Sequence, residues 1–525
     1  MKTLWDWLTT TDHKRIGLLY LFGSLAAFVL AGLAALVIRV QQFDPGLSVV
    51  TGQAYYNVLY FHGAAMILAF LIPGLTGFFG NYLIPLMIGA REVAFPRLNA
   101  FAVQLFLAGI VLALLSMLVP DAPDMLWTGY PPYSIRTTSN TAFYVFTVHL
   151  FSLSSILSGI NLIVTVILMR APNIGWNQLN MTVWCILGAL LMNLIDIPVL
   201  ASAVTMLLTD KYFGTHFYDA SQGGDAVLYQ NLFWFYSHPA VYVIFLPAMG
   251  ILFDVIATMA KNRIFNYKAA VYMGVVGVGF MSSEVWIHHI FTSGMPDWVR
   301  VFMMFTTLMI SVPVGVMVVS LWGTLYKGAV TFNLAMHYAA ACLFLLLIGG
   351  LTGIPLAMVS LNVHLHGTAY VHAHFHFVMA LFATFAFFAG LYYWFPKITG
   401  RTADTLAAKI GFWVNMIGVN MTFWPLLIIG EQGMPRRYWD YSSLPGWFAQ
   451  YHHVATLGAV LNGLGMALIF GNFLYCAWRG QRAPANPWNS RSLEWTHTAS
   501  PPPPRNFAEV PNLAPEWSPY EYVRE

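Results

Sequence analysis

Long apolar stretches separated by short polar segments recur along the whole chain. About twelve of them hold roughly 20 or more residues, enough to cross the hydrocarbon core of a bilayer as a helix. Helices are expected there because open sheet edges cannot face lipid. The pattern therefore predicts an all-α integral membrane protein, a bundle of about twelve transmembrane helices. The expected spans are 17–39, 57–87, 97–119, 142–170, 180–209, 229–260, 268–291, 300–325, 332–354, 370–395, 408–430 and 452–478.

Composition supports a lipid bilayer as the surrounding medium. Of the 525 residues, 58% are hydrophobic and 9% are charged, whereas a soluble domain has about 25% charged residues. The net charge of +3 is too small to indicate nucleic-acid binding. Cys185, Cys342 and Cys476 lie far apart in apolar segments, so we interpret them as small core residues rather than disulfide partners or metal ligands.

The chain shows no internal repeat and no second domain. We expect one domain over 1–525, with helices between about residues 17 and 478 and a Pro-rich tail over 479–525. Of the 24 Lys and Arg residues, 18 fall in the segments that would share one side of the membrane with the N-terminus. The positive-inside rule then predicts a multi-pass protein with both termini in the cytoplasm. We expect the membrane to be a bacterial-type inner membrane.

Histidines in apolar segments are the strongest candidate for chemistry. The run from Val371 to His376 contains alternating histidines. Residues two apart on a helix point about 200° from each other, so His374 and His376 are expected to bind two different objects. Imidazole is a common ligand of haem iron and copper. A single histidine of this kind is more often a hydrogen-bonded core residue, but six together favour metal binding. The six are His62, His238, His288, His289, His374 and His376.

Motifs spread over the chain carry a family resemblance. They are TTDHKRIGLLYL, GNYLIPLMIGAREVAFPRLN, LWTGYPPYS, DAVLYQNLFWFYSHPAVY, VWIHHIFTSGM, VHAHFHFV and GMPRRYWDY. With them the chain resembles subunit I of the haem-copper oxidases, the family of cytochrome c oxidase, over nearly its whole length. The pair Tyr236–Ser237 before His238 is similar to the Tyr-Ser variant of the A-type branch.

The resemblance implies two haems and one copper, CuB, inside the bundle. By resemblance, His62 and His376 would be the axial ligands of a low-spin haem and His374 the single ligand of a high-spin haem. The copper ligands would be His238, His288 and His289, and Tyr242 would match the tyrosine that family members cross-link to a copper ligand. The residues expected to contact the haems or their propionates are Arg39, Trp127, His366, Arg436 and Arg437.

Proton routes depart from the family pattern. Ala240 replaces a glutamate at the end of one channel, whose remaining expected members are Glu92, Asn81, Asn99, Tyr236 and Ser237. The lysine, threonine and serine of the second channel fall at apolar residues, namely Met317, Val314 and Phe253. Gly367 stands where the family has an Asp beside His366, which puts the outer magnesium site in question.

Glu284 replaces an apolar residue of the family, four residues before His288. On a continuous helix it would lie one turn away on the same face. A carboxylate buried there is costly unless it is engaged by a proton or a metal. We therefore expect Glu284 to be a proton donor at the copper site or to support a copper ligand.

The sequence is compatible with two catalytic functions and one non-catalytic function. The first is reduction of O2 to water, with or without coupled proton translocation. By resemblance, electrons would come from cytochrome c (or quinol) through a subunit II that carries a dinuclear copper centre, CuA. Further membrane subunits would complete the complex. Tyr242 favours it. The second is reduction of two NO to N2O, favoured by Glu284 and the missing lysine. The third, a non-catalytic membrane subunit, is disfavoured by the complete set of six histidines.

Overall fold

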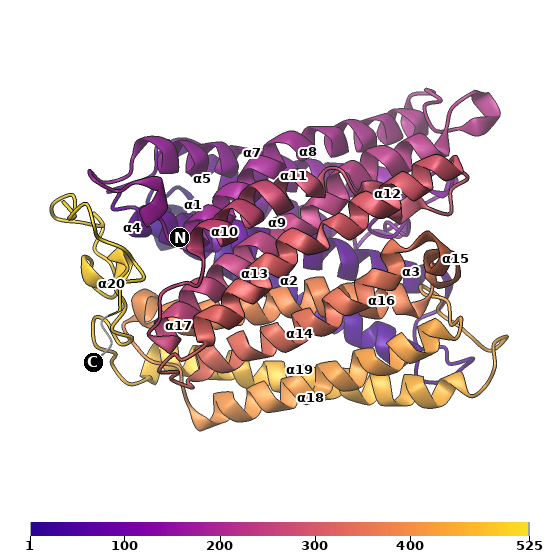
Figure 1. The fold of residues 1–525 in the computed structure, drawn as a ribbon. Helices are drawn as coiled ribbons and strands as arrows, with labels where there is room; N and C mark the ends of the chain where they lie inside the picture. Colours follow the sequence, from indigo (N-terminus) through magenta and orange to yellow (C-terminus); the bar gives the residue numbers. More distant parts are fainter. Residues whose placement is uncertain (1, 523–525) are drawn as a thin grey trace.

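The computed structural model describes residues 2–522 and is all-helical over them, apart from two isolated β-bridges. Eleven helical stretches of the described residues are long and apolar enough to cross a membrane. Figure 1 shows them side by side as an elongated bundle. The unbroken ones are α2 (His13–Gln41), α5 (Pro96–Leu115), α7 (Thr141–Leu168), α8 (Met181–Tyr212), α9 (Ala226–Ala260), α14 (Leu334–Ala357), α18 (Leu406–Glu431) and α19 (Phe448–Arg479).

Three further spans change helix type or are interrupted along their length. The segment Gly52–Met87 joins α3 (Gly52–Ala64), the π-helices η1 (Ala65–Leu71) and η2 (Pro73–Phe78), and α4 (Phe79–Met87). The segment Asp297–Leu325 joins α12 (Asp297–Met309) and α13 (Ser311–Leu325). The segment Ala369–Thr399 joins α16 (Ala369–Phe375), η7 (His376–Leu381) and α17 (Phe382–Thr399). Short helices outside the spans are α1 (Lys2–Leu8), α6 (Tyr133–Arg136), η3 (Trp176–Gln178), η4 (Ala220–Gln222), α15 (Val359–Leu365) and α20 (Leu493–Thr496).

The expected span 268–291 is not one continuous helix. It is divided into α10 (Tyr267–Val271), the π-helix η5 (Tyr272–Val278), α11 (Gly279–Ser282) and the 3-10 helix η6 (Trp286–Ile290). The α-helix ends at Ser282, and Val285 has φ −115° and ψ 8°, outside the helical region. This break separates Glu284 from His288 and makes the expectation of an uninterrupted helix wrong there. A count of twelve spans stays a prediction.

Helix α9 lies at the centre of the bundle. The Asp225 side chain caps it by accepting a hydrogen bond from the Val227 N–H at 2.8 Å. In its most apolar window 89% of the residues are buried, against 28% for α2, which therefore lies at the periphery. Two prolines, Pro239 and Pro247, are accommodated inside α9, where the surrounding helices can satisfy the freed backbone groups.

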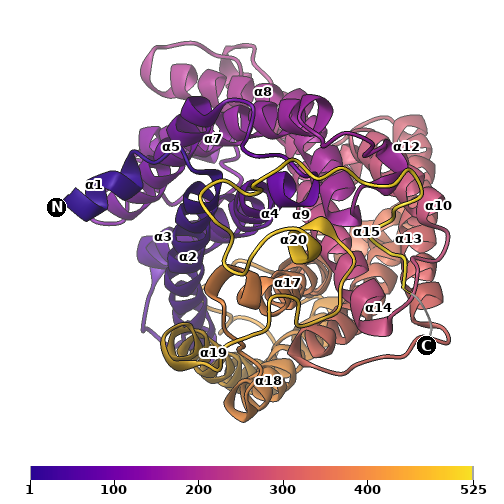
Figure 2. The ribbon, with the colours of Figure 1, turned by 90° about the vertical axis from the view of Figure 1, so that its left-hand side faces the viewer.

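The chain after α19 crosses one end of the bundle. Figure 2 shows this strap, residues 480–522, running over the ends of α4, α9 and α17. Helices α1 and α20 lie at that same end in Figure 1. Residues 1 and 523–525, part of the expected 1–525 domain and 479–525 tail, lie outside the described residues, and the single-domain organisation stays a prediction.

Candidate functional site

One cavity of about 1430 Å³ occupies the interior of the bundle. It exceeds the volume of an ordinary small-molecule pocket, about 300–1,000 Å³, so it has room for more than one large group. All six predicted histidines line it. So do all of the other predicted cofactor contacts and three of the remaining site residues: Arg39, Trp127, His366, Arg436, Arg437, Tyr236, Ser237 and Tyr242.

His238 of α9 and the pair His288 and His289 of η6 converge in this cavity. One ligand atom of each lies within 4.8 Å of the other two, and among the described residues this is the group able to hold a metal ion. His238 Nδ1 lies 3.0 Å from His289 Nε2, and His238 Nε2 is buried without a partner in the described chain. Three imidazole nitrogens that converge in this way, one of them on a histidine with a buried and unpartnered Nε2, form a donor set that suits copper.

Neighbouring side chains orient the members of this triad. The Trp234 ring stacks on His289, with centroids 3.6 Å apart and 7° between the planes. His288 Nδ1 lies 3.3 Å from the Thr307 hydroxyl on α12. Bonds of this kind fix the tautomer and the ring plane of a metal-binding histidine and leave its other nitrogen for the metal.

His62 of α3 and His376 of η7 form a second pair. Their rings lie parallel, 3° apart in plane, with centroids separated by 6.4 Å. His62 Nδ1 donates to the Ala31 carbonyl at 3.0 Å, and His376 Nδ1 donates to the His372 carbonyl at 2.8 Å. Both Nε2 atoms are therefore left for a shared metal, and the gap accommodates imidazole–metal bonds of about 2 Å on each side.

His374 lines the same cavity from α16. Its Nδ1 lies 3.1 Å from the Thr352 hydroxyl of α14, and a Cβ added at Gly353 would come within 2.9 Å of the His374 ring. A glycine at residue 353 is what lets this ring lie against α14. His374 has no parallel imidazole partner among the described residues, so it fits a five-coordinate haem iron, which can bind a gas.

Arg436 and Arg437 bring two positive charges to the cavity wall. Burial, reinforced by the charge of Arg437, lowers the pKa of Arg436 to about 9, and burial also lowers the pKa of Arg437. No carboxylate of the described residues forms a salt bridge with either guanidinium. Adjacent arginines without a protein anion fit the carboxylates of a ligand, such as haem propionates. Burial, reinforced by the charges of these two arginines, lowers the pKa of His366.

Arg39 reaches the cavity from α2. Its Nη1 donates to the Gln42 side chain at 2.8 Å, its Nη2 lies 3.1 Å from His452 Nδ1, and its Nε has no partner in the described chain. Trp127 lies against Gly63, next to His62, where a Cβ would meet the indole at 3.2 Å. Trp127 is thus adjacent to His62, and Arg39 lines the same cavity; their role as haem contacts stays a prediction.

Tyr242 lies on α9 one turn after His238, with ring centroids 4.8 Å apart, and faces the cavity. The predicted spacing of four residues on one helix face is thus observed. Tyr236 and Ser237 also line the cavity, and the Ser237 hydroxyl has no protein partner. These groups bring hydroxyls to the copper side of the site.

The remaining proton-path residues lie at the end of the bundle that the strap covers. Glu92 accepts a hydrogen bond from the Val93 N–H at 3.0 Å, and burial raises the pKa of its carboxyl group. Asn81 and Asn99 are fully buried, with amide atoms that have no partner among the described residues. Buried polar atoms of this kind are commonly satisfied by ordered water. These three residues are thus suited to a hydrated path, but they do not reach the cavity themselves.

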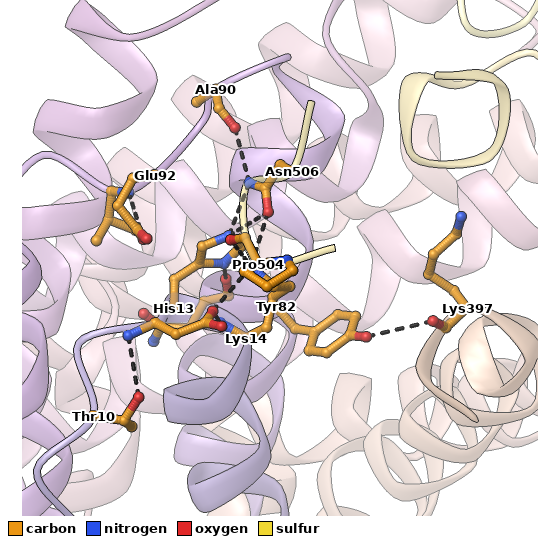
Figure 3. Close-up of polar contacts among 12 residues, drawn as sticks. Thr10, His13, Lys14, Tyr82, Ala90, Glu92, Lys397, Pro504 and Asn506 are labelled. Carbon is orange, nitrogen blue, oxygen red and sulfur yellow. Dashed lines mark hydrogen bonds and ion pairs between the residues drawn. The ribbon is translucent and has the colours of Figure 1, made fainter. Parts of the chain in front are cut away.

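Figure 3 shows how the strap closes this region. Asn506 lies within hydrogen-bonding distance of His13 Nε2 and Lys14 Nζ, at 3.0 and 3.1 Å, and donates to the Ala90 carbonyl at 2.8 Å. His13 in turn donates from Nδ1 to the Asn81 carbonyl at 2.6 Å. One buried amide of the strap therefore joins the start of α2 to the loop that carries Glu92.

The expectation for Glu284 is wrong in its geometry. Its side chain is exposed and does not line the cavity. The α-helix ends two residues earlier and η6 begins two residues later, so the 100° step per residue that would align Glu284 with His288 does not apply. The expected second channel is apolar, as the sequence suggests: Met317 and Phe253 are completely buried.

Several positioning groups are not apparent from the sequence. Thr307, Thr352 and the carbonyls of Ala31 and His372 each bond a histidine of the site. They come from other helices or from the backbone, and threonine in an apolar span carries no signal of its own. His372 has no place among the predicted ligands, yet its carbonyl orients His376.

The fold and cavity define a class of protein: a membrane-embedded helical bundle with histidine sets suited to haem iron and copper. The profile of the family described as "Cytochrome C and Quinol oxidase polypeptide I" matches residues 15–461. The chain belongs to this family and is a haem-copper oxidoreductase. Members of the family generally bind haems and CuB.

Individual relatives agree with this assignment. The chain is 39% identical over 541 residues to "Cytochrome c oxidase subunit 1" of Cereibacter sphaeroides, covering 96% of this chain and 95% of the relative. It is 41% identical over 512 residues to "Heme-copper oxidase subunit I+III" of Aeropyrum pernix, covering 97% and 62%. A solved heme-copper terminal oxidase dimer shares the fold with a TM-score of 0.75 and 21% identity, covering 89% of this chain and 84% of that chain.

Proposed function

We propose that this chain is the catalytic subunit of a respiratory terminal oxidase that reduces O2 to water with electrons from cytochrome c. The observation that carries the proposal is the convergence of His238, His288 and His289 beside Tyr242 in the cavity that His374 also lines. Relatives that the chain covers almost completely are named cytochrome c oxidase subunit 1. Tyr242 favours O2 because splitting the O–O bond needs an extra electron and a proton, which a phenol beside the copper site can supply.

The cofactor assignments follow from the free nitrogens. His62 and His376 would hold a low-spin haem, His374 a high-spin haem, and the triad a copper ion. Bound there, these groups would supply electron transfer and oxygen binding. The cavity-lining residues would position these groups. Arg436 and Arg437 would neutralise propionates, and His366 would contact them from the same side. Arg39 and Trp127 would contact the low-spin haem.

Protons for the reaction would come from the end of the bundle that carries the strap. Glu92 would take up a proton there, and water held by the amides of Asn81 and Asn99 would conduct it toward Tyr236 and Ser237. The raised pKa of Glu92 favours its protonated form, as a donor into the bundle requires. Translocation of further protons belongs to the same proposal.

The proposed oxidase function implies a membrane location and partner subunits. We infer that the chain works in a bacterial inner membrane, with both termini cytoplasmic, together with further membrane subunits. A subunit II with a CuA centre would pass electrons from cytochrome c to the low-spin haem side of the cavity. One relative is named as a fusion of subunits I and III, which supports a multi-subunit assembly.

Reduction of NO is the weaker alternative. One of the two features that favoured it was the expectation that Glu284 is a buried carboxylate beside the copper. The Glu284 side chain is instead exposed and lies outside the cavity lining. The apolar residues Met317 and Phe253 on the second channel remain compatible with it. No relative reported above is named as an NO reductase.

Turnover of the purified complex with each gas tests the proposal. We expect rapid O2 consumption that is lost in Tyr242→Phe, with haem and copper content unchanged. Phe245, a cavity-lining aromatic residue on the same helix, offers the matched control Phe245→Leu, which should keep most activity. Fast NO loss with negligible O2 uptake would reject the oxidase assignment. Outward acidification by reconstituted vesicles tests translocation separately.

A further inference from the structure

Asp196 is a buried carboxylate at the middle of the 32-residue helix α8. Its relative exposure is 1%. The other acidic residues of the described spans lie at or near helix ends, as Asp210, Asp254 and Glu431 do. A carboxylate at bilayer depth is costly and is by default a candidate for function, with proton relay among its commonest roles.

The contacts of Asp196 leave it poorly satisfied as an ion. Its Oδ1 accepts from the Ser283 hydroxyl at 3.4 Å, a long hydrogen bond, and its Oδ2 has no partner among the described residues. No cation is paired with it in the described chain. A structural carboxylate is bonded more fully: both oxygens of Asp254 accept hydrogen bonds, from Tyr520 and from the Thr182 N–H.

A second observation points to bound water beside Asp196. Asn193 lies one turn earlier on the same helix, is 1% exposed, and has neither its amide nitrogen nor its amide oxygen bonded in the described chain. With the Asp196 and Ser237 oxygens, four buried polar atoms without partners in the described chain lie on the two packed helices α8 and α9. Buried water typically occupies such a site, because it needs two to four polar partners.

Tyr236 links this cluster to the metal cavity. It lies on α9, lines the cavity next to Ser237, and interacts electrostatically with Asp196. Asp196 itself does not line the cavity. Asp196 therefore interacts with a residue of the cavity wall without belonging to that wall.

We propose that Asp196 is a proton-holding residue that feeds the copper side of the cavity through Tyr236 and Ser237. The inference rests on the proposed oxidase function and takes the place of the route closed at Met317 and Phe253, which are apolar and fully buried. The carboxyl O–H breaks, and the proton passes along the Tyr236 and Ser237 hydroxyls or their water to the cavity. The carboxylate then takes one proton from the water at Asn193, which is restored from bulk solvent.

Other titratable groups around Asp196 are few. Tyr236 on α9 interacts with it electrostatically. Glu284, next to Ser283, is exposed. On α7, His149 bonds the Thr205 hydroxyl of α8 at 3.1 Å, more than two turns from Asp196. A pH effect of a change at Asp196 is therefore attributed to its own carboxyl group.

The test uses the purified complex with Asp196→Asn, the conservative Asp196→Glu, and the control Glu284→Gln, which makes the same carboxylate-to-amide change at an exposed neighbour. Haem content and the optical spectrum report whether each variant is intact. We expect Asp196→Asn to slow O2 turnover by about 100-fold, the low end of what a positioned proton donor contributes, and to change its pH profile. Asp196→Glu should recover turnover, and Glu284→Gln should match the unaltered protein.

An infrared difference spectrum, reduced minus oxidised, separates this inference from the proposed function. A protonated carboxyl C=O band should be present in the unaltered protein, absent in Asp196→Asn and shifted in Asp196→Glu, whichever gas is the substrate. An intact Asp196→Asn variant with unchanged turnover and an unchanged band would overturn the inference. Failure of the unaltered protein to consume O2, with the band still lost in Asp196→Asn, would reject only the oxidase assignment.

Discussion

The imidazole rings of His62 and His376 lie parallel across the cavity, 6.4 Å between centroids and 3° between planes, although 314 positions separate them in the chain. Each ring is held by a backbone carbonyl, that of Ala31 or of His372. The accepting carbonyls belong to α2 and α16, so backbone geometry sets the orientation of both rings and leaves each Nε2 for a metal.

Replacement of His62 should remove one haem and leave the other. His62→Ala takes away one of two axial nitrogens, so we expect about half of the bound haem to be lost, together with the low-spin optical signature. Haem extraction per mole of protein and the reduced spectrum measure this. His364→Ala changes an exposed histidine outside the cavity and should retain full haem. Equal haem in His62→Ala and the unaltered protein would contradict the assignment.

The Thr307 hydroxyl should matter for copper although it does not bind the metal. It lies 3.3 Å from His288 Nδ1, and loss of such a supporting bond typically weakens metal affinity or activity by about 10–100-fold. We expect Thr307→Val to lower copper occupancy after mild chelation, measured by elemental analysis. The neighbour Thr306 bonds only within its own helix, to Met303, so Thr306→Val is the matched control. Equal copper loss in both variants would contradict the role.

The strap residue Asn506 should hold the end of the bundle closed. Its amide bonds His13, Lys14 and the Ala90 carbonyl, all buried, and leaving such groups unsatisfied costs about 1–3 kcal/mol. We expect Asn506→Ala to speed limited proteolysis within 480–522 and to lower thermal stability. Glu509→Ala, at an exposed residue of the same strap, should behave like the unaltered protein. Identical cleavage of the two variants would argue against the contact.

The directions in which His374 and His376 point could be predicted from the sequence, because they depend only on the local periodicity of a helix. His374 and His376 are two residues apart on helical backbone, and they do face different partners, Thr352 on one side and His62 on the other. The same reasoning failed for Glu284, because it assumes a continuous helix and the α-helix stops at Ser282. A stop within an apolar run, without proline, leaves no mark in the hydrophobic pattern.

Residues whose importance depends on packing between distant helices could not be read from the chain. Asp196 is a single carboxylate in an apolar span, and only the approach of Ser283 and Tyr236 from other elements shows that it faces inward. Thr307 and Thr352 are ordinary threonines until a histidine of another helix lies against them. The family motifs identify ligands, but the groups that orient these ligands follow from the tertiary structure.

Glu494 of α20 should make the stability of the strap depend on pH. Burial, with a smaller contribution from the charge of Asp254, raises its pKa from 4.5 to about 7. Hydrogen bonds, including one from the Trp394 indole at 3.4 Å, oppose the shift without cancelling it. The folded protein thus binds a proton at Glu494 more tightly than the unfolded chain does. Stability is then greatest below pH 4.5 as far as this group is concerned, and falls as the pH rises to about 7.

The Glu494→Gln variant tests this sign. Glutamine keeps the shape of the protonated carboxyl group and cannot ionise, so the loss of stability between pH 4.5 and about 7 should disappear. A shift of this size corresponds to at most about 3 kcal/mol, and the midpoint of thermal unfolding followed against pH measures it. Glu509→Gln, at the exposed strap residue, should keep the pH dependence of the unaltered protein. A Glu494→Gln curve parallel to the unaltered one would mean that Glu494 is ionised in the folded state, with Lys397, whose Nζ bonds the Thr498 and Ala499 carbonyls, as the cation that stabilises it.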